Sequence, residues 1–538
     1  MEIAAALGRV GLPAPLAELA RREWDAIVVG GGHNGLTAAA YLARAGKRVL
    51  VLERREQLGG ACTLEQPFDD ERFLVSPCAY VVGLLDPLVV GELDLERHGY
   101  RVFPADPNLW CPLGDGRSLA QFIDFGQTAE RMRRDGFTES DIRGLAAYEE
   151  LFARARALLR AGPGGDTWVG SSPPRERIEE ILGDPELISL VFDEPIAETI
   201  ERYVSNEAIA RALWGQGVIG TYAGPRDPGT ASVKLMHHQG DLQGLGSVWG
   251  YVEGGMGRAS FALAEAAREA GAVLASGVPV ARIMPGEGVE TESGDIFRAA
   301  TVVSNADPKR TLALVDDERI PRPFAERVGA WMTRSPVIKL NAALSRLPAF
   351  DADSDGLAHR AMVSVAGSVD EGQRAFETCR EGGIDIGFAE IYFQSAYDPS
   401  VAPPGAQTMS VFAQYCPMDL DAEAWEARRS DAATAIFDRI AERAPDVRDC
   451  VTDYEVLGPP DVEQRIGLTG GQIFQGDALP EQMWDRRLDY RSPIPGLYLC
   501  GAATHPGGSV IALNGRNAAF AVLGDLEPDR TCARFRVF

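Results

Sequence analysis

Three glycines near the N-terminus have the spacing of a phosphate-binding turn. Gly30, Gly32 and Gly35 form the pattern G-x-G-x-x-G between an apolar run, Asp25–Gly30, and a segment with helical spacing, Leu36–Ala45. The first glycine permits a tight turn, the second lets the backbone approach a pyrophosphate, and the third lets helix and strand pack closely. The pattern therefore predicts that N–H groups at a helix N-terminus bind the phosphates of a dinucleotide.

A carboxylate follows where a ribose contact is expected. Glu53 comes directly after a second apolar run, Arg48–Leu52, at nearly the spacing of about 20 residues that such sites show. A carboxylate there accepts hydrogen bonds from ribose hydroxyls and repels a 2′-phosphate, which favours an adenosine without that phosphate. The alternative is a surface glutamate at the end of a strand.

A second glycine pair, Gly59 and Gly60, follows soon after in the run Q-L-G-G-A-C-T. Its place after the acidic residue resembles the second phosphate-contacting motif of two-domain flavoenzymes. FAD has an extended pyrophosphate that a second loop can contact, whereas simple NAD dehydrogenases lack this loop. An ordinary loop is the alternative.

Lys339 is a charged residue inside the apolar run S-P-V-I-K-L-N-A-A-L. A buried lysine is costly unless it has a partner, so a functional role is a reasonable hypothesis. The phrase V-I-K resembles the strand of monoamine-oxidase-like flavoenzymes whose lysine holds a water molecule at flavin N5. The alternative is a lysine whose ammonium group reaches solvent.

The histidines give weaker indications. His237 and His238 precede a mid-chain glycine-rich segment, so one of them is a candidate for the wall of a substrate cavity, although a structural role is the more common one. His505 is expected to serve in loop packing. The chain has six histidines and no H-E-x-x-H pattern, and no metal site is predicted.

The elements that must position these residues fall into three clusters. The first is the strand–helix–strand unit around the glycine pattern, a complete βαβ motif. The second comprises a helix at Ser260–Ala270 and strands at Ala272–Leu274, Val278–Ile283, Val289–Thr291, Ile296–Arg298 and Thr301–Ser304. The third comprises a strand at Leu497–Gly501 and a helix from about Ile511 to Val522.

Two long segments separate these clusters. They contain amphipathic helices such as Ile142–Leu159 and Ala432–Ala441, and strand-like runs such as Ser335–Ala343 and Ile384–Phe393. The predicted fold is α/β: a discontinuous, doubly wound Rossmann-type FAD-binding domain, interleaved with an α+β substrate domain. The predicted boundaries are 22–94, 246–314 and 486–528 for the FAD-binding domain, 95–245 and 315–485 for the substrate domain, and 1–21 for an N-terminal extension.

Length and charge bound the function classes. A chain of 538 residues is too long for one hydrophobic core, so at least two domains are expected. The net charge of −25 argues against nucleic acid as a partner, because phosphate binding needs a basic surface. It also weakens purely electrostatic docking on an anionic membrane.

The eight cysteines form no C-x-x-C pair, which argues against a dithiol redox centre. The N-terminus lacks the basic-then-apolar order of a secretory signal, and no stretch approaches about 20 consecutive apolar residues. A cytoplasmic protein is expected. The stretch Ala4–Ala20 is predicted to include an amphipathic helix that packs on a membrane, on a partner or, preferentially, on the protein's own surface.

Several motifs resemble one flavoprotein family, in family order over about residues 24–525. They are Gly30–Leu36, Leu52–Arg54, Leu58–Ala61, Gly250–Gly257, Val302–Pro308 and Gly496–Ala519. Together they resemble the phytoene desaturase and carotenoid dehydrogenase-related flavoproteins. The residues His33–Gly35 (H-N-G) and Trp249–Gly257 (W-G-Y-V-E-G-G-M-G) are most similar to those of a subgroup named for a pyridine nucleotide-disulfide oxidoreductase domain (domain-containing protein 2). The missing C-x-x-C speaks against disulfide chemistry in this chain.

The resemblance implies a non-covalently bound FAD and a set of contacts. By position in the motifs, the adenosine and pyrophosphate contacts are Gly30, Gly32, Gly35, Glu53, Arg54, Gly59 and Gly60, the adenine contact is Val280, a second pyrophosphate contact is Gly501, and the turn under the flavin ring is Gly508, Val510 and Ile511. A helix N-terminus there stabilises negative charge on reduced flavin. Ala61 stands where the family has an arginine, which puts one contact in doubt.

The resemblance implies an oxidoreductase that moves a hydride from a hydrophobic, polyene- or lipid-like substrate to flavin N5. Oxygen, a quinone or another carrier is the expected electron acceptor, and peripheral membrane contact stays open. Three alternatives remain: a flavin-dependent double-bond isomerase without net redox change, an amine oxidase, and a non-enzymatic lipid carrier on the related fold of GDP-dissociation inhibitors.

Overall fold

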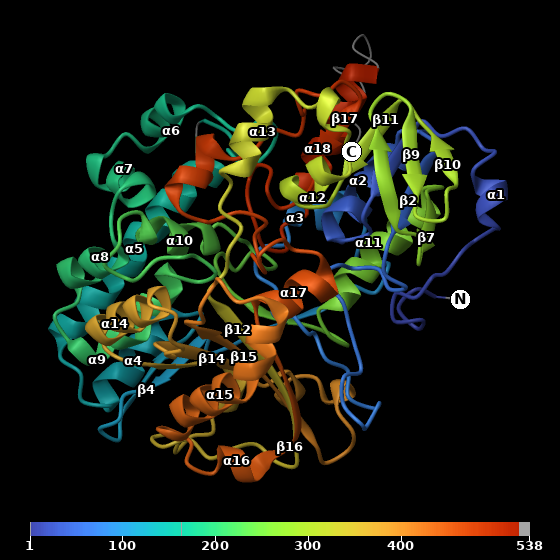
Figure 1. Ribbon diagram of the computed structural model, residues 1–538. Helices are drawn as coiled ribbons and strands as arrows, with labels where there is room; N and C mark the ends of the chain where they lie inside the picture. Colours follow the sequence, from blue (N-terminus) through green and yellow to red (C-terminus); the bar gives the residue numbers. More distant parts are fainter. Residues whose placement is uncertain (1, 163, 527–538) are drawn as a thin grey trace.

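The computed structural model describes residues 2–162 and 164–526. The last two residues of the predicted FAD-binding domain, 527 and 528, and Cys532 lie outside the described residues. Figure 1 shows the parallel sheet and its helices at the upper right, a larger sheet below, and a group of helices at the left.

The parallel sheet brings together strands from three distant parts of the chain. Its order is β17-β11-β1-β2-β7, and all neighbouring strands run parallel. The strands are β1 (Ala26–Val29), β2 (Val49–Glu53), β7 (Val273–Ser276), β11 (Thr301–Ser304) and β17 (Leu497–Leu499). The strands expected near these positions are thereby found in one doubly wound sheet.

Both faces of this sheet are covered, which explains its continuous apolar runs. Ala26 and Val28 pack into the cluster that contains helices α2 (His33–Arg44), α11 (Gly257–Glu269) and α18 (Leu513–Leu526), whereas Ile27 and Val29 point to the opposite face. There they meet a small antiparallel sheet of β8 (Val280–Met284), β9 (Gly288–Thr291) and β10 (Ile296–Arg298).

The second large sheet has seven strands in the order β16-β12-β15-β14-β13-β4-β5. They are β4 (Leu109–Pro112), β5 (Ser118–Gln121), β12 (Val337–Leu344), β13 (Met362–Ala366), β14 (Phe388–Tyr392), β15 (Gln407–Gln414) and β16 (Val451–Leu457). On one face, Ile338, Leu340 and Ala342 pack with α15 (Ala422–Ala441). The alternate residues of β12, among them Lys339 and Asn341, point to the other face, since successive strand residues alternate.

A layer of helices stands beside this sheet (Figure 1). It consists of α4 (Phe125–Arg134), α5 (Glu139–Ala161), α6 (Arg175–Leu182), α7 (Pro185–Phe192), α8 (Ile196–Tyr203), α9 (Glu207–Leu213) and α10 (Thr230–His237). Every residue of α10 is buried. The remaining elements are α3 (Pro87–Glu92), α12 (Pro308–Ala313), α13 (Arg322–Gly329), α14 (Val369–Arg380), α16 (Val447–Cys450), α17 (Pro459–Ile466), β3 (Val102–Pro104) and β6 (Gly250–Val252).

The boundaries between the FAD-binding and substrate domains stay a prediction. The five parallel strands fall in the ranges assigned to the FAD-binding domain, and the seven-stranded sheet falls in those assigned to the substrate domain. Strands β3 and β6, however, pair with each other although the predicted boundary at 245/246 assigns them to different domains.

Several helices begin earlier than the sequence pattern indicates, and their caps explain why. Helix α2 starts at His33, inside the glycine pattern, because Gly32 has the extended backbone of an N-cap. Helix α15 starts at Ala422, since the Asp421 side chain accepts a hydrogen bond from the Ala424 N–H at 2.8 Å. Hydrophobic spacing alone does not reveal such polar first turns.

The N-terminal stretch 4–20 holds one helix of four residues, α1 (Leu16–Leu19), which is too short to form an amphipathic face, so the prediction of an amphipathic helix there is wrong. The segment packs on the protein's own surface. The Ile3 N–H donates to the Glu265 carboxylate at 2.8 Å, and the Gly11 N–H donates to the Ser276 hydroxyl at 2.9 Å. No helix in the described part of the chain is long and apolar enough to cross a membrane.

The contact between α18 and α2 supplies a test of the fold. A Cβ at Gly515 would overlap the carbonyl oxygen of Asn34, whereas a Cβ at Gly329 in α13 would meet nothing within 4 Å. We expect Gly515→Ala to lower the free energy of unfolding by about 1–3 kcal/mol through overpacking. Gly329→Ala is the matched control, expected to be neutral or slightly stabilising. Equal thermal denaturation midpoints for both variants would contradict the packing of these helices.

Candidate functional site

One cavity of about 810 Å³ joins the two large sheets. Its wall includes the glycine turn after β1, the end of β2, the inner face of the seven-stranded sheet and the end of α10. Cavities of this size are typical for cofactors and small molecules. Most of the residues predicted to bind a dinucleotide therefore share one continuous space with the residues predicted to face a substrate.

The glycine turn leaves no room for side chains. A Cβ at Gly32 would lie 2.7 Å from the Asn305 amide nitrogen, and a Cβ at Gly35 would overlap the Gly30 carbonyl oxygen. The second glycine loop docks on the first, with the Gly59 N–H donating to the Gly31 carbonyl at 2.8 Å. The two loops form a cradle of backbone that an extended pyrophosphate can approach closely.

Glu53 is buried at the end of β2, with 6% of its surface exposed. Its two carboxylate oxygens accept hydrogen bonds from the Gly31 N–H at 2.7 Å and the Arg55 N–H at 2.8 Å. Burial raises the pKa of Glu53 above its usual range, against the lowering effect of these two N–H groups. The carboxyl group lines the cavity and is placed to accept hydrogen bonds from ribose hydroxyls.

The predicted cofactor residues divide into two groups by their position. Eight line the cavity: Gly30, Gly32, Glu53, Arg54, Gly59, Gly60, Val280 and Val510. The other four, Gly35, Gly501, Gly508 and Ile511, do not line the cavity. Their positions therefore do not favour direct contact with the cofactor. Gly501 and Gly508 instead leave space for the side chains of Gln475 and Phe474, which do line the cavity. The assignment of individual contacts stays a prediction.

Two buried polar atoms at the start of α2 have no hydrogen-bond partner in the described chain. They are His33 Nε2 and Asn34 Oδ1, and both residues line the cavity. Burial lowers the pKa of His33 to about 4, so its ring is neutral near pH 7. Because buried polar groups are rarely left unpaired, a bound group is expected to supply partners. The cradle, the buried acid and these atoms fit FAD.

Lys339 points from β12 into the cavity, with 4% of its surface exposed, so the alternative of a lysine that reaches solvent is wrong. Its Nζ donates to Asn341 Oδ1 at 2.9 Å and to the Ser410 hydroxyl. It also lies 4.1 Å from the centre of the Tyr80 ring. Burial lowers the pKa of Lys339 to about 7, against the opposing effects of Cys78 and Glu455.

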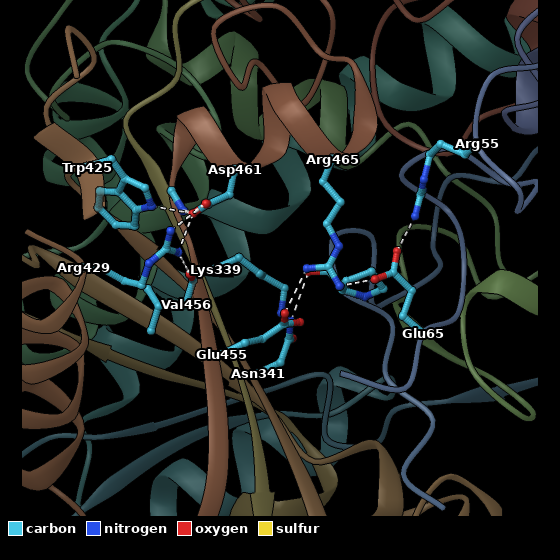
Figure 2. A network of polar contacts seen from close by, with 12 residues as sticks. Arg55, Glu65, Lys339, Asn341, Trp425, Arg429, Glu455, Val456, Asp461 and Arg465 are labelled. Atoms are coloured by element: carbon cyan, nitrogen blue, oxygen red, sulfur yellow. Dashed lines mark hydrogen bonds and ion pairs between the residues drawn. The ribbon is translucent and has the colours of Figure 1, made fainter. Parts of the chain in front are cut away.

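A polar network links Lys339 to the nucleotide end of the cavity (Figure 2). Asn341 accepts from Lys339 and donates to Glu455 at 3.1 Å, and Glu455 accepts from Arg465 at 2.9 Å. Arg465 and Arg55 both bind the Glu65 carboxylate. Since the Arg55 N–H donates to Glu53, the network runs from the substrate sheet to the proposed ribose site.

Helix α17 closes the cavity over this end. Val462 and Ile466 from this helix line the wall. The Arg54 guanidinium donates to the carbonyl oxygens of Gln464 and Arg465 at 3.2 and 3.1 Å, which are at the last turn of the helix. A cation is favourable at the C-terminus of a helix, so Arg54 holds α17 as well as lining the cavity.

Sequence reasoning missed Glu390 and Tyr392, which line the cavity from β14. The Tyr392 hydroxyl donates to Glu390 at 2.9 Å, and Glu390 has 3% of its surface exposed. The signal was present in the run G-F-A-E-I-Y-F, where one acid stands among apolar residues as Lys339 does in its strand. Glu390 is therefore as recognisable from the sequence as Lys339 is.

Both mid-chain histidines line the cavity, although a structural role was the favoured expectation for them. His238 lies beside Glu149, 3.5 Å from Nε2 to the carboxylate, and Glu149 is held by the fully buried Lys234 at 3.0 Å. His505 contacts the Thr167 carbonyl at 2.8 Å and lies outside the cavity wall, consistent with loop packing. Among the described residues, no cluster of His, Cys, Asp or Glu could hold a metal ion.

Comparison with known proteins identifies two sequence families along the chain. Residues 28–81 match the NAD(P)-binding Rossmann-like domain, and residues 116–523 match the flavin containing amine oxidoreductase family. The chain is 32% identical to pyridine nucleotide-disulfide oxidoreductase domain-containing protein 2 of Mus musculus, over 94% of each protein. It is 23% identical to the lycopene-forming phytoene desaturase of Pseudescherichia vulneris, over 93% of this chain and 99% of that one.

Solved structures show the same fold. Cyclohexylamine oxidase from Brevibacterium oxydans superposes with a TM-score of 0.54 at 16% sequence identity, over 94% of this chain and all of that one. The family matches and the fold confirm the Rossmann-type FAD-binding architecture and identify the cofactor as FAD.

Glu53 offers a direct test of the nucleotide site. We expect Glu53→Gln to weaken FAD binding by about 10-fold, because a neutral amide forms weaker hydrogen bonds with ribose hydroxyls than a carboxylate does. FAD titration of the deflavinated protein, followed by quenching of flavin fluorescence, measures the change. Glu56→Gln is the matched control, since Glu56 is exposed and does not line the cavity. Unchanged affinity in both variants would remove Glu53 from the ribose site.

Proposed function

The chain belongs to the flavin containing amine oxidoreductase family, and we propose that it is an FAD-dependent enzyme that removes a hydride from a C–H bond of a hydrophobic, polyene- or lipid-like substrate. The observation that carries this proposal is a continuous cavity, lined at one end by the glycine cradle and at the other by the inner face of the seven-stranded sheet. Bound FAD supplies a hydride acceptor at N5.

The apolar part of the cavity supports a hydrophobic substrate. Its wall away from the glycine cradle includes Val81, Ile219, Val248, Trp249 and Met362. Such side chains exclude water and hold a substrate by burial of apolar surface. The similarity to a phytoene desaturase is in agreement with this substrate class.

Lys339 is the group we assign to the chemistry. A buried amine with a pKa near 7 is present in substantial part as the neutral form, which can accept a hydrogen bond from a water molecule. Asn341 and Ser410 accept from its N–H groups and fix its direction. The residue is thus a candidate for holding one ordered water, or for receiving a proton, at the reacting end of the substrate.

Amine oxidation is the second candidate, and it rests on the same lysine and on the fold shared with cyclohexylamine oxidase. An amine substrate and an apolar substrate place different demands on the cavity, since an ammonium needs a carboxylate or aromatic faces. The electron acceptor (oxygen, a quinone or another carrier) is part of the proposal in either case.

The first experiment is an absorption spectrum of the purified protein, with chromatography of the chromophore released by heat. We expect flavin bands and free FAD, because the residues that form the cradle are complete. Polyenes, fatty acids and amines are then added anaerobically. We expect a compound that the enzyme oxidises to bleach the flavin band. A colourless protein that cannot be reconstituted with FAD would contradict the proposal and favour a carrier. Turnover only after prior reduction, without substrate oxidation, would favour an isomerase.

A variant tests the role of Lys339. We expect Lys339→Met to retain FAD and to slow substrate-dependent flavin reduction or reoxidation by about 100-fold. This is the rate effect expected when a group that transfers a proton or holds a water molecule is removed. Because the pKa is lowered to about 7, the neutral form increases as pH rises through 7, and the wild-type rate should rise there. Cys78, Glu455 and Tyr80 are the titratable groups that face the amine.

Stopped-flow absorbance between pH 6 and 9 measures both effects. Lys309→Met is the control, because Lys309 does not line the cavity. A rate and a pH profile of Lys339→Met equal to those of the wild type would assign Lys339 a structural role only.

A further inference from the structure

The seven-stranded sheet forms the floor of the substrate part of the cavity, and its register fixes the order of the side chains there. Lys339 on β12 pairs with Phe412 on β15, and Phe412 pairs with Glu390 on β14. Residues paired directly across strands point to the same face. At about 4.8 Å per strand, Glu390 lies roughly 10 Å across the sheet from Lys339, with the Phe412 ring between them.

The neighbouring row continues this floor toward the surface. Ser410 pairs with Tyr392, and beyond them Met362, Leu109 and Gln121 pair in turn on β13, β4 and β5. All except Ser410 line the cavity. Past β5, the wall ends at Ile123 and Phe125, each 36% exposed, with Leu245 nearby in the lining at 42%. The cavity thus leads from the FAD end, over Glu390, to an apolar mouth.

Glu390 has unused hydrogen-bonding capacity in this floor. Tyr392 donates to its Oε2 atom, but no described residue donates to Oε1. Two rings lie beside the carboxyl group: that of Tyr392, two residues along β14, and that of Phe412, its partner on the neighbouring strand β15. Since only 3% of the surface of Glu390 is exposed, its carboxyl group is costly to bury unless both oxygens are paired.

A second acceptor faces the same space. His237 Nδ1 lies 2.8 Å from the Val233 carbonyl oxygen, so it must carry the proton, and Nε2 is left as an acceptor. No described residue donates to Nε2, and the ring stands between Trp249 and Phe474, both of which line the cavity. Burial lowers the pKa of His237 to about 4, which keeps the ring neutral.

A pure hydrocarbon cannot satisfy these acceptors. Filling the cavity with one would leave both Glu390 Oε1 and His237 Nε2 without a donor. Each buried, unpaired polar group costs about 1–3 kcal/mol, and displacing a bound water without replacing its hydrogen bonds loses affinity. The floor therefore selects against a substrate that is apolar throughout.

We propose that Glu390, oriented by Tyr392, is a binding subsite for a hydrogen-bond-donating group, a hydroxyl or an amine, carried by an otherwise apolar substrate. This inference rests on the proposed function, since it concerns the substrate of the same cavity. The donor group binds roughly 10 Å from Lys339. Apolar parts of the substrate extend from it toward Lys339 on one side and toward the mouth at Ile123 and Phe125 on the other. His237 is available to a second donor on the same substrate.

Three small probes of equal chain length test the subsite on the FAD-loaded protein. Hexylamine and 1-hexanol donate hydrogen bonds, whereas 1-methoxyhexane accepts but cannot donate. Isothermal titration calorimetry gives the dissociation constants without requiring turnover. We expect at least one of the two donors to bind about 10-fold more tightly than the ether, as one charge-assisted or buried hydrogen bond allows.

The variant Glu390→Gln distinguishes the two donors. If the subsite takes an ammonium, the variant should bind hexylamine about 10-fold more weakly, because the charge is lost. If the subsite takes a hydroxyl, the variant should bind 1-hexanol about 3- to 10-fold more weakly than the wild type does. The affinity for hexylamine should then fall by no larger a factor. Tyr392→Phe, which keeps the ring but removes the donor to Glu390, should weaken the same ligand. Glu377→Gln is the matched control, since Glu377 is exposed on α14 and does not line the cavity.

The results separate this inference from the proposed function. Equal affinity for the ether and both donors, no saturable binding of any probe, or donor affinities unchanged by both Glu390→Gln and Tyr392→Phe would overturn the subsite. If the protein nevertheless contains FAD that a substrate reduces, the proposed function stands alone. If no substrate reduces the FAD while the donor probes bind through Glu390, the subsite stands and the proposed oxidation fails.

Discussion

The structure depends on how Glu53 is held at the end of β2. Its two oxygens accept the N–H groups of Gly31 and Arg55, so one buried carboxylate fixes both the glycine turn before it and the loop after it. Unpaired, that charge would be too costly to bury. Because Arg55 also binds Glu65, the loop that follows the second glycine pair is tied to the same point. The nucleotide cradle is therefore preorganised by backbone and carboxylate together.

The same requirement, that buried charges be paired, connects the two large sheets. From Glu65 the network passes through Arg465 and Glu455 to Asn341 and ends at Lys339, so side chains from far-apart segments meet without a break (Figure 2). A charged residue on the inner face of a central strand is tolerated because each partner satisfies the next. Removing one member would leave its neighbours unpaired, which is costlier than losing one contact.

The cavity combines an apolar wall, which suits a hydrocarbon, with a polar floor, which suits a group that forms hydrogen bonds. Its wall is largely apolar toward the mouth, but its floor presents an ammonium-forming group and a carboxyl group on either side of Phe412. In the proposed hydride removal, such a cavity contributes mainly by positioning the substrate and excluding water. In the proposed function, the polar groups on the floor govern which part of the substrate reaches the flavin end.

The sequence by itself determined the dinucleotide site, because G-x-G-x-x-G and the acid after the second strand act through local backbone geometry that a strand–turn–helix unit imposes wherever it forms. It also indicated Lys339, since a charge in an apolar strand is conspicuous. It did not place Lys339 and Glu390 on the same face of one sheet, on either side of Phe412. It also did not show that His237 Nε2 is left without a donor. These depend on strand order and register in a sheet built from segments far apart in the chain. Only tertiary structure could decide them, because long-range pairing brings together residues that no local pattern connects.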